Sequence, residues 1–124
     1  MKLKNFNVQF GAQIFKAFSD ESRIRIMNLL YRNEELCISD LEMILDFTQT
    51  KTSRHITYLK NAGLLSFRKH DQWVFYHIKE EALDIVDQIF QYLNKDPLLQ
   101  SDNRTFEVLN SNRELSIKKL RLPL

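Results

Sequence analysis

The chain has 124 residues, with 44% hydrophobic and 27% charged side chains and a formal net charge of +2, which fits one ordinary globular domain. Its one cysteine, Cys37, excludes an internal disulfide framework, and no apolar run approaches the roughly 18 residues that a membrane helix needs. Residues 1–10 lack the continuous apolar core of a secretory signal, so we expect a cytoplasmic protein without a membrane partner.

The N-terminal part of the chain predicts two helices. Large apolar side chains recur every four residues from Phe6 to Phe18, which predicts an amphipathic helix over about residues 5–18. Ser19 and Asp20 are both candidate N-caps for a second helix. That helix is almost continuously apolar, so we expect it at the centre of the core.

A short third helix is expected over about residues 38–46. Its start stays open, because Ser39 with Glu42 and Cys37 with Asp40 have the same capping-box spacing. A fourth helix follows almost at once, and the brief link between them has the spacing of a helix-turn-helix.

The pattern changes after the fourth helix, which we expect to begin after a cap at Thr48 and to stop at Gly63. Apolar and polar residues alternate before and after residues 70–72, which predicts a β-hairpin. The helical period returns from Glu80, and Pro97 is expected to end this last helix.

These elements predict a mainly α-helical protein with a small β-hairpin. Four helices, a hairpin and a fifth helix, followed by a C-terminal extension, form the order of a winged helix-turn-helix. We expect residues 1–95 to form this winged helix-turn-helix domain. Residues 96–124 are an extension of undecided structure, in which Ser101 or Asp102 could cap a sixth helix. That extension could pack across a dimer, fold on a partner or stay disordered.

Positive charge is concentrated where the fourth helix and hairpin are expected. Residues 48–79 hold six Lys or Arg residues against one Asp, whereas residues 33–47 hold five carboxylates and no Lys or Arg. No carboxylate occurs from Thr48 to Asn61. A helix with one apolar face and one face of cations, hydroxyls and amides suits a DNA groove, where such side chains meet phosphates and base edges.

Three stretches carry a resemblance to a known family. Residues 18–26 read FSDESRIRI, residues 48–56 read TQTKTSRHI, and the helix end and second hairpin strand read NAGLL and WVFY. These stretches resemble the ArsR-type bacterial repressors over about residues 12–93. The resemblance implies a homodimeric winged-helix repressor that binds operator DNA and releases it on an inducing signal. By position, it places Gln49, Thr50, Ser53 and Arg54 where the family contacts bases and backbone.

The DNA contacts are expected from the fourth helix and the wing. The full set of candidate DNA-binding residues is Gln49, Thr50, Lys51, Ser53, Arg54, His55, Tyr58, Arg68 and Lys69. The wing tip departs from the family pattern, because Asp71-Gln72 stands where a Gly followed by Arg is usual. An acid at the tip repels phosphate, which puts wing contacts in doubt.

The signal that the protein senses is open. Thiol-based sensors of the family have Cys-Val-Cys near the third helix, whereas this chain has Cys37-Ile38-Ser39. One thiolate cannot hold a soft metal tightly, and the last helix offers carboxylates without a histidine, so we expect no metal and no cofactor. Cys37 keeps two interpretations: a small buried apolar residue, or an oxidisable thiol at a helix N-terminus that senses redox change.

A dimer is expected because the first and last helices carry more apolar surface than one small core covers. The candidate seam residues are Phe6, Phe10, Ile14, Ile85, Ile89, Phe90, Tyr92 and Leu93. Two-fold pairing would place two reading helices one DNA turn apart. The competing interpretation is that these residues complete the core of a monomer.

The sequence therefore predicts a sequence-specific DNA-binding regulator, in which residues 1–95 are the DNA-binding and dimerisation domain. We expect a homodimeric repressor that binds a palindromic operator through residues 48–61. One alternative is a winged-helix protein-interaction module whose basic face meets an acidic protein, and another is a redox-responsive repressor that senses through Cys37. An enzyme is not expected, because one Cys and three scattered His form no nucleophile–base pair.

Overall fold

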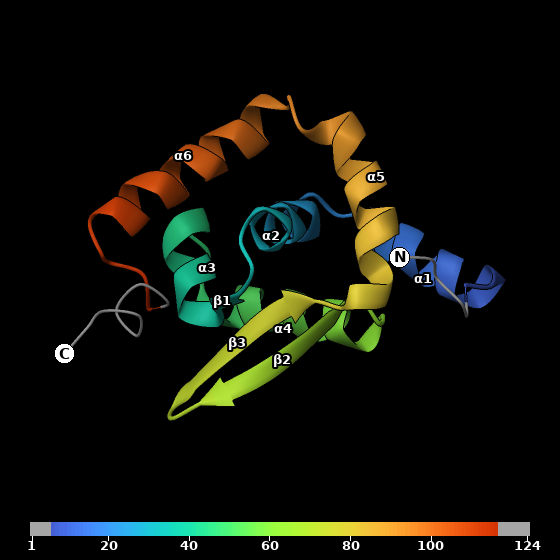
Figure 1. Cartoon of the computed structure of the whole chain (residues 1–124), viewed down its shortest axis with the longest axis horizontal. Coiled ribbons are helices and arrows are strands. Elements are labelled where there is room, and N and C mark those ends of the chain that lie inside the picture. Colours follow the sequence, from blue (N-terminus) through green and yellow to red (C-terminus); the bar gives the residue numbers. More distant parts are fainter. Residues whose placement is uncertain (1–5, 117–124) are drawn as a thin grey trace.

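The computed structural model describes residues 6–116. Most of the helices lie above a small sheet in the view of Figure 1, and the two longer strands of that sheet project from the lower side of the molecule as a ribbon. The elements in chain order are α1 (Val8–Ala17), α2 (Glu21–Arg32), β1 (Leu36–Cys37), α3 (Ile38–Leu45), α4 (Gln49–Asn61), β2 (Leu65–His70), β3 (Trp73–Ile78), the 3-10 turn η1 (Glu80–Ala82), α5 (Leu83–Leu93) and α6 (Pro97–Ser111).

Side-chain caps decide where several helices begin. The Asn7 side chain accepts a hydrogen bond from the N–H of Phe10 at 2.8 Å, so α1 starts at Val8 and not near residue 5. Asp20, one of the two candidate caps, accepts from the N–H of Arg23 at 3.0 Å. At α3, Cys37 is the N-cap without a side-chain cap bond, so neither predicted capping box forms.

Gly63 ends the α4 region as expected. Its φ of +87° lies in the left-handed region, which side chains with a Cβ rarely adopt. A Cβ at this position would also lie 3.1 Å from Cε1 of Phe10. The glycine therefore lets the chain reverse from α4 into β2 while α1 packs closely against the turn.

The predicted hairpin is present but belongs to a three-stranded antiparallel sheet in the order β1-β3-β2. In the hairpin, His70 pairs with Trp73, so a two-residue turn at Asp71-Gln72 joins the strands. The third strand, β1, pairs Leu36 with Tyr76. Two residues are too few to show an alternating pattern, which explains why the sequence did not reveal β1.

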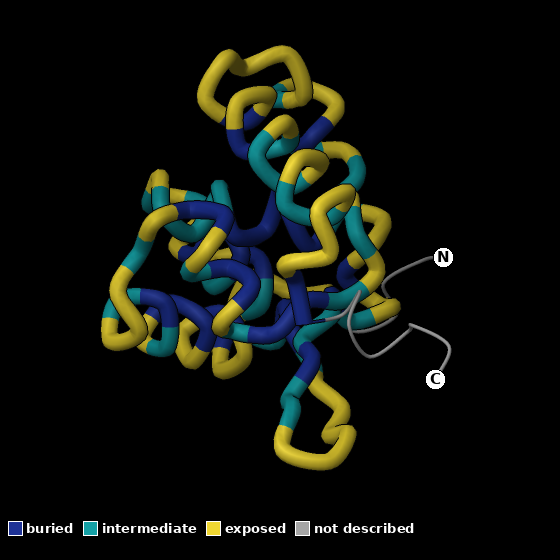
Figure 2. Tube along the Cα trace, turned by 90° about the vertical axis from the view of Figure 1, so that its left-hand side faces the viewer, coloured by how far each residue is buried: buried dark blue, intermediate teal, exposed yellow. Residues whose placement is uncertain are grey.

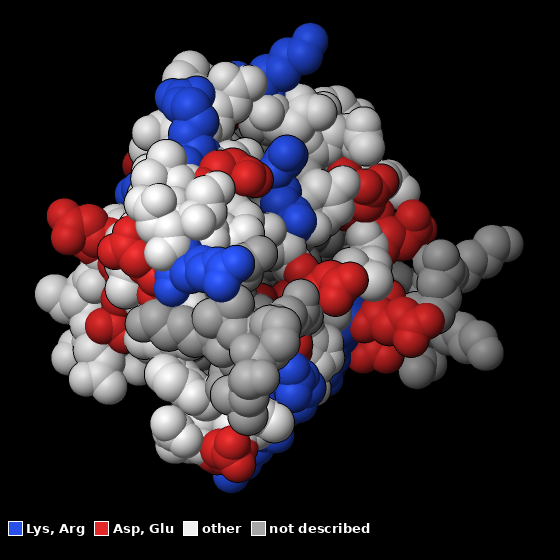
Figure 3. Space-filling model, turned by 60° about the vertical axis from the view of Figure 1, so that its left-hand side comes forward, with Lys and Arg blue, Asp and Glu red and all other residues white. Residues whose placement is uncertain are grey.

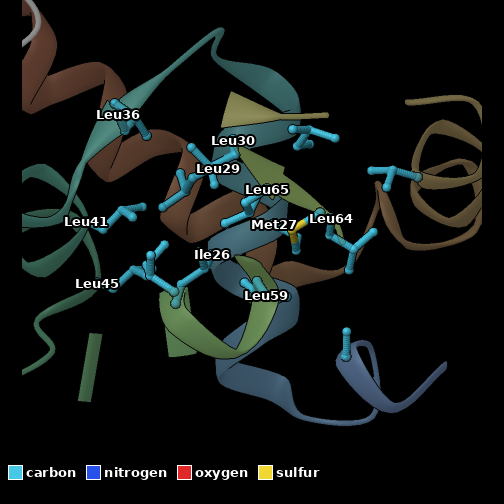
Figure 4. Close-up of a cluster of buried hydrophobic side chains, with 14 of the residues drawn as sticks. Ile26, Met27, Leu29, Leu30, Leu36, Leu41, Leu45, Leu59, Leu64 and Leu65 are labelled. Atoms are coloured by element: carbon cyan, nitrogen blue, oxygen red, sulfur yellow. The ribbon is translucent and has the colours of Figure 1, made fainter. Parts of the chain in front are cut away.

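Helix α2 lies at the centre of the core, as predicted. Figure 4 shows its apolar side chains converging with those of α3, α4, β1 and the start of β2. The fully buried members include Ile26, Met27 and Leu29 of α2, with Leu41 and Leu59 from its neighbours. Along the chain trace, buried segments gather in the body of the molecule, whereas the hairpin tip is exposed (Figure 2).

The C-terminal extension forms a helix on this body, and the predicted cap of that helix was wrong. Helix α6 begins at Pro97, because Asp96 caps it by accepting from the N–H of Leu98 at 2.8 Å. Ser101 and Asp102 therefore lie inside the helix and do not cap it, and α5 ends at Leu93, before the proline.

Helix α6 packs on α2 and α3 of its own chain. Asn28 of α2 donates to the side-chain oxygen of Asn103 at 2.9 Å. After the helix, Leu115 is fully buried, and the N–H of Ser116 donates to the Asp40 carboxylate at 2.7 Å. The rest of the extension, residues 117–124, lies outside the described residues. Within residues 6–116, no helix has the length and apolar character to cross a bilayer.

Candidate nucleic-acid interface

The turn between α3 and α4 sets the direction of α4. Asp46 adopts a left-handed conformation with φ 57°, which ends α3 abruptly. Two residues later, the Thr48 side chain accepts from the N–H of Lys51 at 3.1 Å and caps α4. The Thr52 hydroxyl donates to the Thr48 carbonyl at 2.8 Å, which strengthens the first turn. The predicted helix-turn-helix geometry thus arises from a left-handed residue and a cap in close succession.

Helix α4 has two distinct faces. Thr52, Ile56 and Leu59 are buried against the body, as the sequence predicted. The residues of α4 exposed to solvent are Gln49, Thr50, Arg54, Thr57, Tyr58, Lys60 and Asn61. Among the described residues, no ion pair or hydrogen bond holds the Arg54 side chain, so its guanidinium is available to a ligand. The surface of α4 therefore offers donors, acceptors and cations without a carboxylate of its own.

His55 was wrongly expected among the outward residues. Its exposed fraction is only 7%, because it follows Thr52 by three positions and precedes Leu59 by four, which places it on the buried face. Burial lowers the pKa of the imidazole from its ordinary value of 6.5, and the Asp20 carboxylate acts in the opposite direction. The cations of Arg23, Arg54 and Lys51 add to the lowering. His55 therefore packs α4 against the start of α2 and does not face a ligand.

Two other candidates on α4 are already engaged by neighbouring side chains. The Lys51 ammonium lies 4.0 Å from the ring centroid of Phe47, and the guanidinium carbon of Arg23 lies 4.1 Å from that of Tyr58. Both distances are those of cation–π contacts. Lys51 is half-buried and Tyr58 is 40% exposed, so both retain accessible surface. The contact between Arg23 and Tyr58 spans two helices and has no signal in the sequence pattern.

The wing carries fewer available cations than the sequence indicated. Arg68 donates two hydrogen bonds to the Glu35 carboxylate, at 2.8 and 2.6 Å, so its charge is largely compensated. Lys69 and His70 are exposed near the tip, and Asp71 occupies the turn with φ 53°. Figure 3 shows basic atoms toward the lower end of the molecule, where the hairpin projects, with acidic atoms beside them. Lys69 is the better of the two wing candidates.

Cys37 is placed as a structural residue. Its exposed fraction is 3%, and burial raises the pKa of the thiol, with Ser39 nearby at 3.1 Å between Sγ and Oγ. An oxidisable sensor needs the opposite shift, toward the thiolate. Burial and the raised pKa both favour the interpretation of Cys37 as a buried structural residue.

The described residues do not fit a site for a soft metal. Within residues 6–116, no group of three or more His, Cys, Asp and Glu side chains lies close enough together to hold a metal ion. The chain offers one thiol, and Cys37 is buried with its pKa raised. Tight binding of a soft metal needs several thiolates.

The residues proposed for the dimer seam differ in how far they are exposed. Ile14 and Phe90 are 1% exposed and belong to the core of the single chain, so they were wrongly assigned to a seam. Phe6 is 45% exposed and Tyr92 90%, and the other four candidates, Phe10, Ile85, Ile89 and Leu93, are half-buried.

The seam prediction also missed exposed apolar side chains on the same two helices. Phe15 is 73% exposed and Val8 90% on α1, and Leu83 is 43% exposed on α5. Periodicity could not separate the core stripe from the outer one, because both repeat with the helical turn.

Comparison with known proteins identifies the family. The family model described as "Bacterial regulatory protein, arsR family" matches residues 20–66, from the cap of α2 into β2. The arsenical resistance operon repressor of Escherichia coli K12 is 42% identical over 83 residues, which cover 64% of this chain and 71% of that protein. The arsenic resistance transcriptional regulator ArsR1 of Pseudomonas putida is 37% identical over 78 residues. The match covers 63% of this chain but only 61% of that relative's length.

The solved structures agree with the fold. HlyU from Vibrio cholerae N16961 superimposes with a TM-score of 0.64 at 28% identity, over 71% of this chain and 96% of HlyU. A winged helix-turn-helix domain from Mycobacterium bovis, 20% identical, superimposes with a TM-score of 0.61. The predicted fold class is thereby confirmed, and the two relatives from Pseudomonas putida and Escherichia coli are named as a transcriptional regulator and an operon repressor. The chain belongs to the ArsR family of bacterial regulatory proteins, with the winged helix-turn-helix fold.

Proposed function

We propose that this protein is a transcriptional repressor that binds a palindromic DNA operator as a homodimer. The observation that carries the proposal is α4, whose outer face presents cations, hydroxyls and amides without a carboxylate while its aliphatic underside anchors it to the body. The relative from Escherichia coli is named as an operon repressor. Binding to operator DNA would place this protein in the cytoplasm.

Base reading is assigned to the first turns of α4. Recognition helices contact base edges mainly with their N-terminal residues. Gln49, Thr50 and Arg54 are exposed there, and Ser53 is half-buried beside them. Amide, hydroxyl and guanidinium groups match the donor and acceptor pattern of the major groove. Lys51 and Lys69 are assigned to phosphates, because their ammonium groups are point charges without bidentate geometry.

The seam of the proposed dimer lies on α1 and α5. These helices adjoin at one side of the molecule (Figure 1), where Phe18 at the end of α1 packs edge-on against Phe90 at a centroid distance of 5.9 Å. Phe15 and Tyr92 present exposed rings outward from the same two helices. Apolar surface of this kind is stabilised when a second copy covers it. An isologous dimer would bring two α4 helices to successive major grooves.

The experiment is selection of bound duplexes from a random pool, followed by affinity measurements on the selected site over a range of salt concentrations. We expect a palindromic motif and a steep salt dependence, because each phosphate contact releases counterions. Arg54→Ala should cost about 1–3 kcal/mol of binding and relax the preference at one base pair. Arg104→Ala is the matched control, since Arg104 is an exposed cation on α6.

Two outcomes would change the assignment. If Arg54→Ala loses the same affinity for every DNA sequence, Arg54 contacts a phosphate and not a base, and the repressor proposal stays intact. Failure of the wild-type protein to bind any duplex would overturn the proposal and favour an acidic protein as the partner of α4.

The dimer is tested by sedimentation at micromolar concentration. We expect the wild-type chain to sediment as a dimer and Phe15→Glu as a folded monomer, because Phe15 is 73% exposed and not needed for the core. A wild-type monomer at this concentration would remove the dimer from the proposal.

A further inference from the structure

The side chain of Arg23 connects three helices. It lies in the first turn of α2, and its Nε and Nη2 donate to the carbonyl oxygens of Ala17 and Lys16, both at 2.9 Å. These two carbonyls are at the C-terminal end of α1, where helical acceptors lack a partner within the helix. A cation is also favoured there by the helix dipole. Arg23 therefore closes the end of α1.

The same guanidinium stacks on the helix assigned to DNA. Its Cζ lies 4.1 Å from the ring centroid of Tyr58, in the second half of α4. A planar guanidinium can stack on a ring through its face while its edge donates hydrogen bonds, which an ammonium cannot do. The backbone N–H of Arg23 donates to the Asp20 cap, which holds the residue at the start of α2. One guanidinium thus donates two hydrogen bonds to the end of α1 and lies over a ring of α4.

We propose that Arg23 is a positioning residue that sets the placement of α4 relative to α1. This inference rests on the proposed function, in which α1 lies at the dimer seam and α4 reads DNA. If α1 is part of the seam, the angle between α1 and α4 decides how far apart the two copies of α4 lie. Arg23 and Tyr58 then determine which spacing between the two half-sites of an operator is accepted.

A positioning role differs from two simpler roles in what it predicts. Substitution of a residue that only stabilises the fold lowers the fraction of folded protein, so binding to all duplexes falls by the same factor. Removal of a cation that only contacts phosphate lowers the affinity for every duplex, and lysine replaces such a cation well. A positioning residue changes the ratio of affinities between operators whose half-sites differ in separation.

The experiment compares the selected palindrome with versions that have a base pair inserted or removed at its centre. For wild type we expect a strong preference for the original spacing. Arg23→Lys keeps the charge but loses the planar guanidinium, and we expect the preference to fall about two- to fivefold, the range of one exposed cation–π contact. Tyr58→Leu should reduce the preference to a similar extent, and the double variant should be no worse than either single one.

Two controls complete the design. Tyr58→Phe keeps the ring and should retain the spacing preference, even if loss of the hydroxyl weakens overall binding. Arg32→Lys is the matched control on α2, since Arg32 is exposed in the last turn of that helix. Circular dichroism and thermal unfolding establish that each variant is folded, and Tyr58→Leu keeps the test valid if Arg23→Lys does not fold.

The outcomes separate this inference from the function on which it rests. An unchanged spacing preference in folded Arg23→Lys or in Tyr58→Leu would overturn the positioning role while leaving the repressor proposal in place. A wild-type protein that selects no duplex would instead overturn the repressor proposal itself.

Discussion

Arg25 on α2 and Asp102 on α6 form a bidentate ion pair, with Nε and Nη2 donating to the two carboxylate oxygens at 2.8 and 2.9 Å. The two residues are 77 positions apart, and both side chains are largely withdrawn from solvent, with exposed fractions of 22% and 6%. The Arg25 guanidinium also lies 5.2 Å from the ring of Phe47, in the turn before α4. The pair therefore joins α6 to α2, the helix against which α4 packs.

The first prediction concerns this pair. Asp102→Ala should lower the free energy of unfolding by about 2–3 kcal/mol, because it leaves a partly buried guanidinium without its partner. Asp102→Asn keeps one acceptor and should lose less. Glu107→Ala, at an exposed position of α6, should change stability by less than about 0.5 kcal/mol. Urea unfolding followed by circular dichroism measures all three, and equal effects at positions 102 and 107 would contradict the importance of the pair.

The second prediction concerns pH. Burial lowers the pKa of His55 in the folded protein below its ordinary value of 6.5. Between these two pKa values the unfolded chain binds a proton that the folded chain does not, so stability falls as pH falls below about 6.5. The slope from one such group is at most about 1.4 kcal/mol per pH unit. Above that pH the effect is absent.

The measurement is the free energy of unfolding between neutral and mildly acidic pH. His55→Gln should flatten the dependence, because it removes the buried imidazole. An identical pH profile for wild type and His55→Gln would show that the buried imidazole does not govern it.

The third prediction concerns Cys37. Because the thiol is buried and its pKa is raised, a disulfide reagent should react slowly with the folded protein and quickly with the chain in concentrated guanidinium chloride. Peroxide should not release operator DNA, and Cys37→Ser should bind the operator as wild type does. Release by peroxide in wild type but not in Cys37→Ser would support the redox-sensor interpretation.

The fourth prediction concerns the wing. Lys69→Ala should lower the slope of log affinity against log salt by about 1, the value for one phosphate contact. Arg68→Ala should change the slope less, because Glu35 already compensates this charge at 2.6 and 2.8 Å. Electrophoretic mobility shifts at several salt concentrations give both slopes. A larger effect from Arg68 than from Lys69 would mean that the ion pair opens when DNA binds.

Local signals in the sequence were enough to predict much of the fold. The cap at Thr48, the left-handed Gly63 and the alternating strands around Asp71 act over a few neighbouring residues, so the pattern reveals them. The faces of α4 could also be predicted, except at His55. This residue was expected to face outward, although its spacing from Thr52 and Leu59 indicates that it is buried with them. The two-residue strand β1 was too short to leave a pattern.

The amino-acid sequence by itself determined the order of the elements, the winged helix-turn-helix class and the residues at the start of α4, because caps, turns and helical periodicity are short-range effects. Only the tertiary structure decided which charges are already compensated, which apolar residues are core, and where α6 lies. Arg68 meets Glu35, Arg25 meets Asp102 and Arg23 meets Tyr58 across long sequence separations. Such contacts depend on how whole elements pack, and no local pattern encodes them.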